Sequence, residues 1–386
     1  MRSLNPTGNS RGEPYLALAA IKLGETMPIT DTLDIPRDPQ QETIVQADAL
    51  HKLLVDMLVH KGMFAAEASI GASRLVEADL RGIHSHGSRA IWRYLEGMDM
   101  GDIDPRAKVL TVRETPAMAV LDGGKGLGHV AATQAMQLAI EKARQVGTGT
   151  VAVRRSQHYG AASVYAMMAI EAGMISFNTT STGPATVAPF GGRQPATANN
   201  AFSWGVPTRS GAPFVLDMAC AISSWGKVES LKIYGQPLPD GWALDADGNA
   251  TLDPAAAKTM LPASGARGYG LAFLSSVLAG PLVGARMPIH KSWSVAADGS
   301  EHFFYCIDIK QFVDESEFYS ELEAAVGDIR HLPPAEGFDR VRIPGELEWE
   351  RAAAWRRDGI PIHRDHAQKL AALAQSMKLD VPWRST

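Results

Sequence analysis

Apolar residues recur at helical spacing over most of residues 45–101, which predicts a group of amphipathic helices there. Beyond this region, short β-like runs alternate with glycine-, proline- and threonine-rich turns, a pattern typical of a largely antiparallel or mixed sheet rather than repeated βαβ units. We therefore predict an α/β (α+β) fold with helices around a mainly antiparallel or mixed sheet. The predicted strands are 117–121, 150–153, 175–180, 202–206, 214–216 and 303–309, and the predicted later helices are 129–145, 161–172, 270–282, 315–326, 348–358 and 364–378.

A glycine-rich segment, residues 123–128, joins the run at 117–121 to the helix at 129–145. Its spacing is G-x-G-x-G, whereas the Rossmann fingerprint needs G-x-G-x-x-G and an acidic residue near the end of the next strand. The next strand instead ends in Arg154 and Arg155. The segment therefore favours a tight turn that leads into a helix, in a non-Rossmann fold.

Composition narrows the class of protein. The chain has 386 residues, 45% hydrophobic and 20% charged, which is enough for a large core. Its net charge of −5 argues against nucleic acid as the main partner. Two cysteines make no disulfide framework, so we expect a cytoplasmic, reducing location. No signal-peptide pattern and no apolar run of membrane-spanning length is expected, and residues 1–43 resemble a flexible or arm-like extension.

The segment Arg-Gly-Ile-His-Ser-His-Gly at 81–87 interrupts the helical pattern with polar residues. Histidine changes charge near neutral pH, so Ser85 and His86 are candidates for proton transfer or ligand binding. A polar helix end with a glycine stop explains the same residues. The segment by itself leaves both interpretations open.

Three later motifs also carry candidate chemistry. His158 lies in Ser-Gln-His-Tyr-Gly at a predicted strand end, where it either faces a cleft or caps a helix. Asp217 ends an apolar run and is either a buried, paired carboxylate or a helix N-cap. Arg267 lies between glycines ahead of an apolar helix. It either binds phosphate or another anion, or lies in a flexible loop with its side chain in solvent.

Histidines are too sparse to predict a metal site. The nearest pairs are His84 with His86 and His363 with His366, and neither pair has a third ligand nearby. We therefore predict no metal, and we interpret the second pair as a surface helix face.

Taken in order, the motifs resemble the non-Rossmann malate/L-lactate dehydrogenase family, which includes ureidoglycolate dehydrogenase, 2,3-diketogulonate reductase, sulfolactate dehydrogenase and piperideine-2-carboxylate reductase. The resemblance covers roughly residues 45–385. It rests on RGIHSHG (81–87), GLGHVAA (126–132), SQHYG (156–160), VAPFGG (187–192), LDMA (216–219), WGKV (225–228), LPDGWALDADG (238–248), GARGYGL (265–271) and RIPGE (342–346).

The resemblance implies an oxidoreductase that uses NAD or NADP to interconvert 2-oxo and 2-hydroxy acids, or the matching imine and amine. It also implies a sulfolactate/malate dehydrogenase-like fold and a homodimer with the active site near the interface. His158 resembles the family's acid/base and His86, after Ser85, a substrate-orienting histidine. The implied cofactor contacts are Ser181 or Thr182, Asp217, Met218, Ala219, Arg267, Gly268, Gly345 and Glu346.

The chain departs from the family pattern in three places. The arginine expected five residues after Ser85 is replaced by Ala90, so either Arg89 or Arg93 is left to bind a substrate carboxylate. The family's Gly-Thr-Asn-Pro is Ala-Asn-Asn-Ala at 198–201, which makes Asn200 a candidate substrate contact. Arg267 replaces a lysine and keeps its charge.

From these patterns and the resemblance we predict four regions: the extension at 1–43, a helical domain at 44–115, a cofactor-binding sheet domain at 116–330, and C-terminal helices at 331–386 that pack on the helical domain. The predicted substrate is a small 2-oxo or 2-hydroxy acid. The alternatives are a cyclic-imine carboxylate reductase and a catalytically impaired relative that binds a small molecule.

Overall fold

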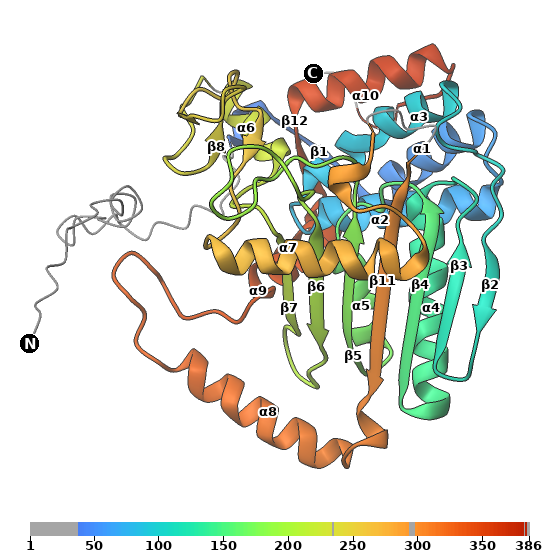
Figure 1. The fold of residues 1–386 in the computed structure, drawn as a ribbon, viewed down its shortest axis with the longest axis vertical. Helices are drawn as coiled ribbons and strands as arrows, with labels where there is room; N and C mark the ends of the chain where they lie inside the picture. The colour runs from blue at the N-terminus through green and yellow to red at the C-terminus, as the bar shows by residue number, and fades with distance from the viewer. Residues whose placement is uncertain (1–37, 234, 293–297, 382, 384–386) are drawn as a thin grey trace, which may run out of the picture.

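A mixed seven-stranded sheet forms the centre of the molecule (Figure 1). The structure is a computed structural model that describes residues 38–386 except 234, 293–297, 382 and 384–386, so most of the predicted extension at 1–43 lies outside it. The strand order is β2-β3-β4-β11-β5-β6-β7, with β3 and β4 parallel and the other neighbours antiparallel. The mixed sheet confirms the predicted fold class. Its strands are β2 Leu110–Glu114, β3 Met118–Asp122, β4 Thr148–Ser156, β5 Met174–Ser181, β6 Ala201–Val206, β7 Phe214–Ala219 and β11 Ser300–Asp308.

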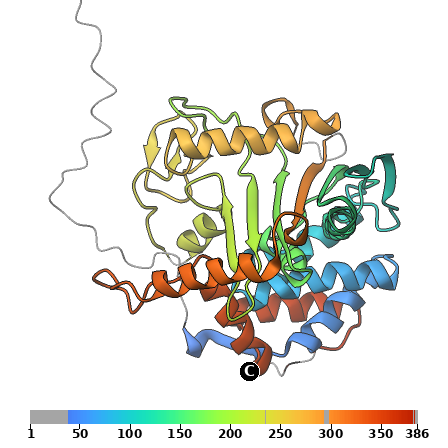
Figure 2. The same cartoon turned by 90° about the horizontal axis from the view of Figure 1, so that it is seen from below.

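Helices cover both faces of this sheet (Figures 1 and 2). Helices α4 and α5 lie on one face, where Val151 and Phe304 of the sheet join Met136 of α4 and Tyr165 of α5 in one buried cluster. Helix α7 crosses the other face and packs Ala272 against the sheet. The bounds are α4 Gly128–Val146, α5 Ser163–Glu171 and α7 Ala266–Leu278.

One stretch of the described chain, Ala266–Val283, has the length and apolar composition of a membrane-spanning helix, and 39% of it is buried. The expectation that no such run exists was therefore wrong by that measure. Length and composition alone do not distinguish a membrane span from a helix that packs on a sheet, and α7 contacts β5.

A second layer combines helices from the two halves of the sequence. Its core joins Leu54 and Leu75 with Trp355 and Leu370, and β1 pairs with β12 in a two-stranded antiparallel sheet beside it. The two strands cover residues 42–45 and 360–363, and neither strand was predicted, because neither has an alternating apolar pattern long enough to indicate one. The elements are β1 Glu42–Val45, α1 Ala47–His60, α2 Ala65–Leu80, α3 Ile91–Asp99, α9 Glu346–Asp358, β12 Ile360–His363 and α10 Arg364–Ser376.

Two smaller parts lie at the periphery. The turn-rich stretch around 236–260 forms a three-stranded sheet next to α6, and α8 projects from the far end of β11 with Tyr319 as its buried residue (Figure 1). The sequence analysis missed α6 and the short strands because they lack an extended periodicity. Their bounds are α6 Trp225–Ile233, β8 Ala243–Leu244, β9 Ala250–Thr251, β10 Thr259–Met260 and α8 Glu315–Arg330, with short 3₁₀ turns at Pro39–Gln41, His84–His86, Ser88–Ala90, Pro281–Val283, Pro288–His290 and Ile309–Gln311.

The glycine-rich segment 123–128 brings α4 close to the loop that follows β4. A Cβ on Gly128 would lie 2.0 Å from the carbonyl oxygen of Gln157 and 2.5 Å from that of His158. Real Cβ atoms do not approach so closely, so glycine is needed here for packing. This contact accounts for Gly128, and the chain turns there into α4 as predicted.

Candidate active site

The segment 81–87 is fixed by a buried carboxylate. Asp79, near the end of α2, accepts a hydrogen bond from the Ser88 N–H at 2.7 Å and lies 2.8 Å from His84 Nδ1. A Cβ on Gly87 would lie 2.2 Å from Asp79 Oδ1, so this position requires glycine. Charge-assisted bonds of this kind hold a loop in one conformation. The segment is therefore a tightly held turn after α2, and the sequence analysis did not identify Asp79.

Two predicted residues from distant loops meet above the sheet. The rings of His86 and His158 are stacked, with centroids 5.5 Å apart and an angle of 29° between their planes. Ser85 Oγ lies 2.9 Å from His86 Nδ1. Both histidines are half-buried, so they remain accessible to a small molecule. The structure thus brings Ser85, His86 and His158 together.

Two donors surround Nδ1 of His158. The Tyr94 hydroxyl lies 2.8 Å away, and the N–H of Gly160 donates to the same nitrogen at 3.3 Å. A backbone N–H can only donate, so Nδ1 is an acceptor and the neutral ring carries its proton on Nε2. Burial raises the pKa of Tyr94, which keeps its hydroxyl protonated. Tyr94 follows the apolar pattern of α3, and no sequence signal set it apart from the core.

A buried network supports this loop from the sheet below. His302 on β11 lies 2.9 Å from Thr180 Oγ1 through Nδ1 and 3.1 Å from the Gln157 carbonyl oxygen through Nε2. Its ring also stacks on Tyr159 at 4.6 Å between centroids. The loop that carries His158 is therefore anchored on both sides of the histidine. His302 was missed because one polar residue within an apolar strand gives no functional signal.

The site favours neutral histidines. Burial lowers the pKa of His158 well below its usual value, and the positive charge of Arg93 lowers it further. The same two causes lower the pKa of His86 to about 4. Near neutral pH both rings are therefore uncharged, and His158 can donate a hydrogen bond from Nε2.

These shifts predict an unusual pH profile. If His158 is the acid/base, kcat/KM for oxidation of a hydroxy acid should stay level as pH falls from 8 through 6.5, because the free enzyme keeps His158 deprotonated. In the reductive direction kcat/KM should keep rising through the same range, because the protonated fraction is still increasing. Initial rates in both directions between pH 5 and pH 8 test this. A half-loss of oxidation near pH 6.5 would contradict it.

The two candidate arginines lie in different surroundings. Arg93 is exposed on α3 next to Tyr94, and its charge acts on both His86 and His158. Arg89 lies in the 3₁₀ turn before α3, and its charge acts on His366 instead. Of the two, Arg93 is therefore the one within electrostatic reach of the histidine pair.

The interpretation of His363 and His366 as a surface helix face was wrong. His366 is buried, its Nε2 lies 3.3 Å from Ser88 Oγ, and its ring meets Trp92 edge-on. His363 caps α10 by accepting from the N–H of Asp365. The His366 side chain points into the helical layer because α10 packs there, whereas the His363 side chain is 35% exposed. In the part of the chain that the structure describes, no group of three or more His, Cys, Asp or Glu side chains could hold a metal ion.

Asp217 lies on β7. Its carboxylate accepts a hydrogen bond at 2.8 Å from the N–H of Ser163, the first residue of α5. Burial raises the pKa of this carboxyl, although the bonds from Ser163 oppose that shift. Met218 and Ala219 follow on the same strand and are half-buried. A carboxylate in this position meets the positive end of the α5 dipole.

Asn200 is fully buried and has three protein partners. Its amide nitrogen donates to Ser276 Oγ at 2.8 Å and to the Ala272 carbonyl oxygen at 3.2 Å, and its oxygen accepts from the Thr182 N–H at 3.3 Å. The side chain therefore ties the end of β5 to α7. Contact with a substrate stays a prediction, and in this conformation no side-chain atom is left free for it.

The predicted cofactor residues form two groups. Ser181 ends β5, where its hydroxyl is buried and has no hydrogen-bond partner among the described residues. Arg267 is exposed in the first turn of α7, and Gly268 beside it is required because a Cβ would lie 2.1 Å from the Ala263 carbonyl oxygen. A cation at the N-terminus of a 13-residue helix suits a phosphate. An exposed arginine at a helix N-terminus and a hydroxyl without a partner among the described residues are compatible with a dinucleotide, and contact of these residues with a cofactor stays a prediction.

Gly345 and Glu346 lie next to β7, the edge strand of the sheet that carries Asp217. Gly345 has a φ of 88°, and a Cβ there would lie 2.7 Å from Val215 Cβ on β7. Glu346 accepts from the Ile343 N–H at 3.0 Å and pairs with Arg330 at 3.3 Å. The turn is therefore fixed next to the strand that carries Asp217, and its contact with a cofactor stays a prediction.

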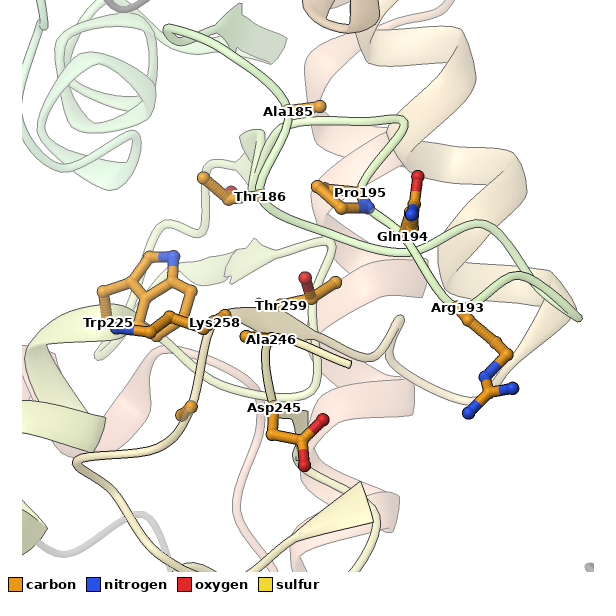
Figure 3. A pocket seen from close by; sticks show the side chains of 11 residues that line it. Ala185, Thr186, Arg193, Gln194, Pro195, Trp225, Asp245, Ala246, Lys258 and Thr259 are labelled. Carbon is orange, nitrogen blue, oxygen red and sulfur yellow. The ribbon is translucent and has the colours of Figure 1, made fainter. Parts of the chain in front are cut away.

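A cavity of about 590 Å³ lies apart from these residues, beside the small sheet (Figure 3). Figure 3 shows Trp225 and Arg193 on opposite sides, with Thr259 between them. None of the predicted site residues lines it. The next residue after Trp225 is Gly226, where a Cβ would lie 3.0 Å from Ser85 Cβ. The start of α6 thus lies next to both the cavity and Ser85.

Comparison with known proteins gives a consistent result. The family model described as malate/L-lactate dehydrogenase matches residues 45–371. A malate dehydrogenase from Pyrococcus abyssi is 35% identical over 342 residues, which cover 86% of this chain and 94% of that protein. The solved malate dehydrogenase from Pyrococcus horikoshii OT3 has a TM-score of 0.82 at 32% identity and covers 90% of this chain and 99% of its own. A Δ1-piperideine-2-carboxylate reductase from Pseudomonas syringae pvar. tomato has a TM-score of 0.78 at 27% identity, covering 86% and 100%.

Proposed function

Because this chain belongs to the malate/L-lactate dehydrogenase family and is therefore an oxidoreductase, we propose that it transfers hydride between NAD or NADP and C2 of a small 2-hydroxy or 2-oxo acid. The observation that supports this most is the pairing of His86 with His158, whose Nδ1 is held by Tyr94 and Gly160. Bound nicotinamide would supply or accept the hydride. Arg267, Gly268, Ser181 and Thr182 would hold the phosphates and ribose, and the strand 217–219 would border the nicotinamide.

In this proposal His158 handles the proton. In reduction, Nε2–H donates to the 2-oxo oxygen and polarises the carbonyl, and the protonated ring gives up the Nε2 proton as C2 receives hydride. In oxidation, the ring takes the hydroxyl proton at Nε2, which first requires the neutral ring to move its own proton from Nε2 to Nδ1. In that tautomer the Tyr94 hydroxyl turns from donor to acceptor of the Nδ1–H, and the Gly160 N–H gives up its bond to Nδ1. His86, held by Ser85, orients the substrate, and Arg93 binds its carboxylate.

The test is the oxidation of NADH and NADPH, followed with pyruvate, oxaloacetate, oxoglutarate and a cyclic-imine carboxylate, and the reverse reaction with ureidoglycolate-type substrates. Turnover of at least one 2-oxo or 2-hydroxy acid, lost in the His158→Asn variant, is the expected result. Binding of neither cofactor would reject the proposal. It would favour the alternative of a small-molecule-binding relative without catalysis.

A second candidate reaction is reduction of a cyclic-imine carboxylate. The match to a Δ1-piperideine-2-carboxylate reductase and the altered loop at 198–201 both favour including it. The same residues would serve, because reduction of C=N also places hydride on the carbon next to a carboxylate. Comparing kcat/KM for the cyclic imine with that for the open-chain oxo acids separates the two candidates.

The proposed working form is a homodimer whose interface lies near the active site. Helix α7, which carries the cofactor candidate Arg267 in its first turn, leaves large apolar side chains exposed. Phe273 is 48% exposed, Leu274 is 53% exposed and nearby Leu282 is 58% exposed. Exposed apolar patches of this kind mark protein contacts. A second copy of the chain is the occupant we propose, with the compartment expected to be the cytoplasm.

A single charge placed on the exposed face of α7 tests the proposed dimer interface. Leu274→Glu should convert the dimer to a monomer, because the new carboxylate would be buried without a partner. Leu252 is a matched control, since it is 52% exposed but follows β9 in the small sheet and is not part of α7. Light scattering after size-exclusion chromatography should give the mass of a dimer for Leu252→Glu. A dimeric Leu274→Glu variant would reject this interface.

A further inference from the structure

A third histidine, His129, lies beneath the proposed proton donor. It is the second residue of α4, is fully buried, and has no role in the steps proposed above. Its ring meets the ring of Tyr94 edge-on, with centroids 5.1 Å apart and planes at 87°. On another side it reaches Gly160, where a Cβ would lie 2.6 Å from His129 Nε2. His129 therefore fills the space between Tyr94 and Gly160.

These two neighbours are the two groups that bond to Nδ1 of His158. If either group moved away, the neutral His158 ring could carry its proton on Nδ1 as well as on Nε2, because the groups that donate to Nδ1 select the tautomer. We propose that His129 is a positioning residue: its ring holds Tyr94 and Gly160 on Nδ1 of His158 and so keeps the ring proton on Nε2, facing the substrate. The proposal rests on the function proposed above.

The state of the His129 ring agrees with a role based on shape. Burial is the main cause that lowers its pKa to about 3, so the ring is neutral. Neither ring nitrogen has a hydrogen-bond partner among the described residues. Unpaired polar atoms are unfavourable in a core, so an aliphatic side chain would suit a purely structural position better.

The first experiment measures the tautomer directly and needs no substrate. Nitrogen-15 NMR of the imidazoles should show His158 with Nδ1 unprotonated and Nε2 protonated in the wild-type protein. In His129→Ala the same signals should shift to a mixture of both tautomers. A single, unchanged tautomer in the variant would overturn the proposal, whatever reaction the protein catalyses. Because NADH is not required, this readout is independent of the proposed function.

The second experiment is a double-mutant cycle in the reductive direction. His129→Ala should lower kcat about 10-fold with little change in the KM for NADH, because it acts through the proton donor and not the cofactor site. In a Tyr94→Phe background the same substitution should lower kcat less, because the hydrogen bond from Tyr94 to His158, one of the two contacts that His129 supports, is already absent. Full additivity, or a loss confined to KM, would overturn the proposal.

His366→Ala is the matched control. It also removes a buried histidine that meets an aromatic ring edge-on, but its contacts are Trp92 and Ser88 rather than Tyr94 and Gly160. It should lower thermal stability without changing the His158 tautomer. If His129→Ala does not fold, His129→Asn, which leaves less empty space, gives the same two readouts.

Discussion

Replacing His158 by asparagine is expected to lower kcat about 10²–10⁴-fold, the range typical of losing a general acid/base. The dissociation constant of NADH should be unchanged. Asparagine can still accept the hydrogen bond from the Tyr94 hydroxyl, so we expect the loop that carries residue 158 to keep its conformation. It cannot gain and lose a proton near neutral pH. Rapid-reaction measurement of hydride transfer and fluorescence titration of NADH separate the two quantities.

The size of this effect distinguishes His158 from its stacked neighbour. His86→Asn should act mainly on substrate KM, because His86 is proposed to orient the substrate and not to exchange a proton with it. Near-normal turnover in His158→Asn, or an equal kcat loss in both variants, would contradict the assignment. A uniform loss of NADH binding would point to a folding defect instead.

Arg93→Gln is expected to lower kcat/KM for a carboxylate substrate about 10–100-fold, since a hydrogen bond to a charged group contributes about 1.5–3 kcal/mol. The loss should be mainly in KM. A second effect should accompany it: the pKa of His158 should rise, because the positive charge of Arg93 is one cause of its lowering. The pH profile of kcat/KM should then show an inflection closer to 6.5.

Arg89→Gln provides the comparison, because this arginine is close in sequence and acts electrostatically on His366 rather than on His158. We expect kcat/KM to change little in this variant. If Arg89→Gln gives the larger loss, the carboxylate is bound on the other side of α3. That result would reverse the assignment but leave the role of His158 intact.

Much of the fold could be predicted because long periodic stretches dominate it. The helix expected at 129–145 is observed at Gly128–Val146, and the strand expected at 303–309 is observed at Ser300–Asp308. Strand β2 was missed because all five of its residues are exposed, so it has no apolar alternation. Strands β1 and β12 were missed because each is four residues long and pairs with a partner far away in sequence.

The candidate site could be predicted only in part, for a different reason. His86 and His158 lie in polar loops, where an unusual residue is conspicuous. Tyr94, His129 and His302 lie in regular helices and strands, where the same pattern that predicts the element also explains the residue. The choice between Arg89 and Arg93 depended on the 3₁₀ turn before α3, whose rotation per residue differs from that of an α-helix. Helical spacing could not resolve it.

The helical layer has a consequence for the order in which the protein matures during synthesis. His84 stacks on Trp355 of α9, and Ser88 reaches His366 of α10, so the segment with Ser85 and His86 rests on residues made some 270 positions later. The partners of α4 and α5 in the sheet are available earlier. A nascent chain that has reached β11 can therefore complete the sheet while its histidine pair still lacks support. We expect the protein to become active only after α9 and α10 have been translated and have docked.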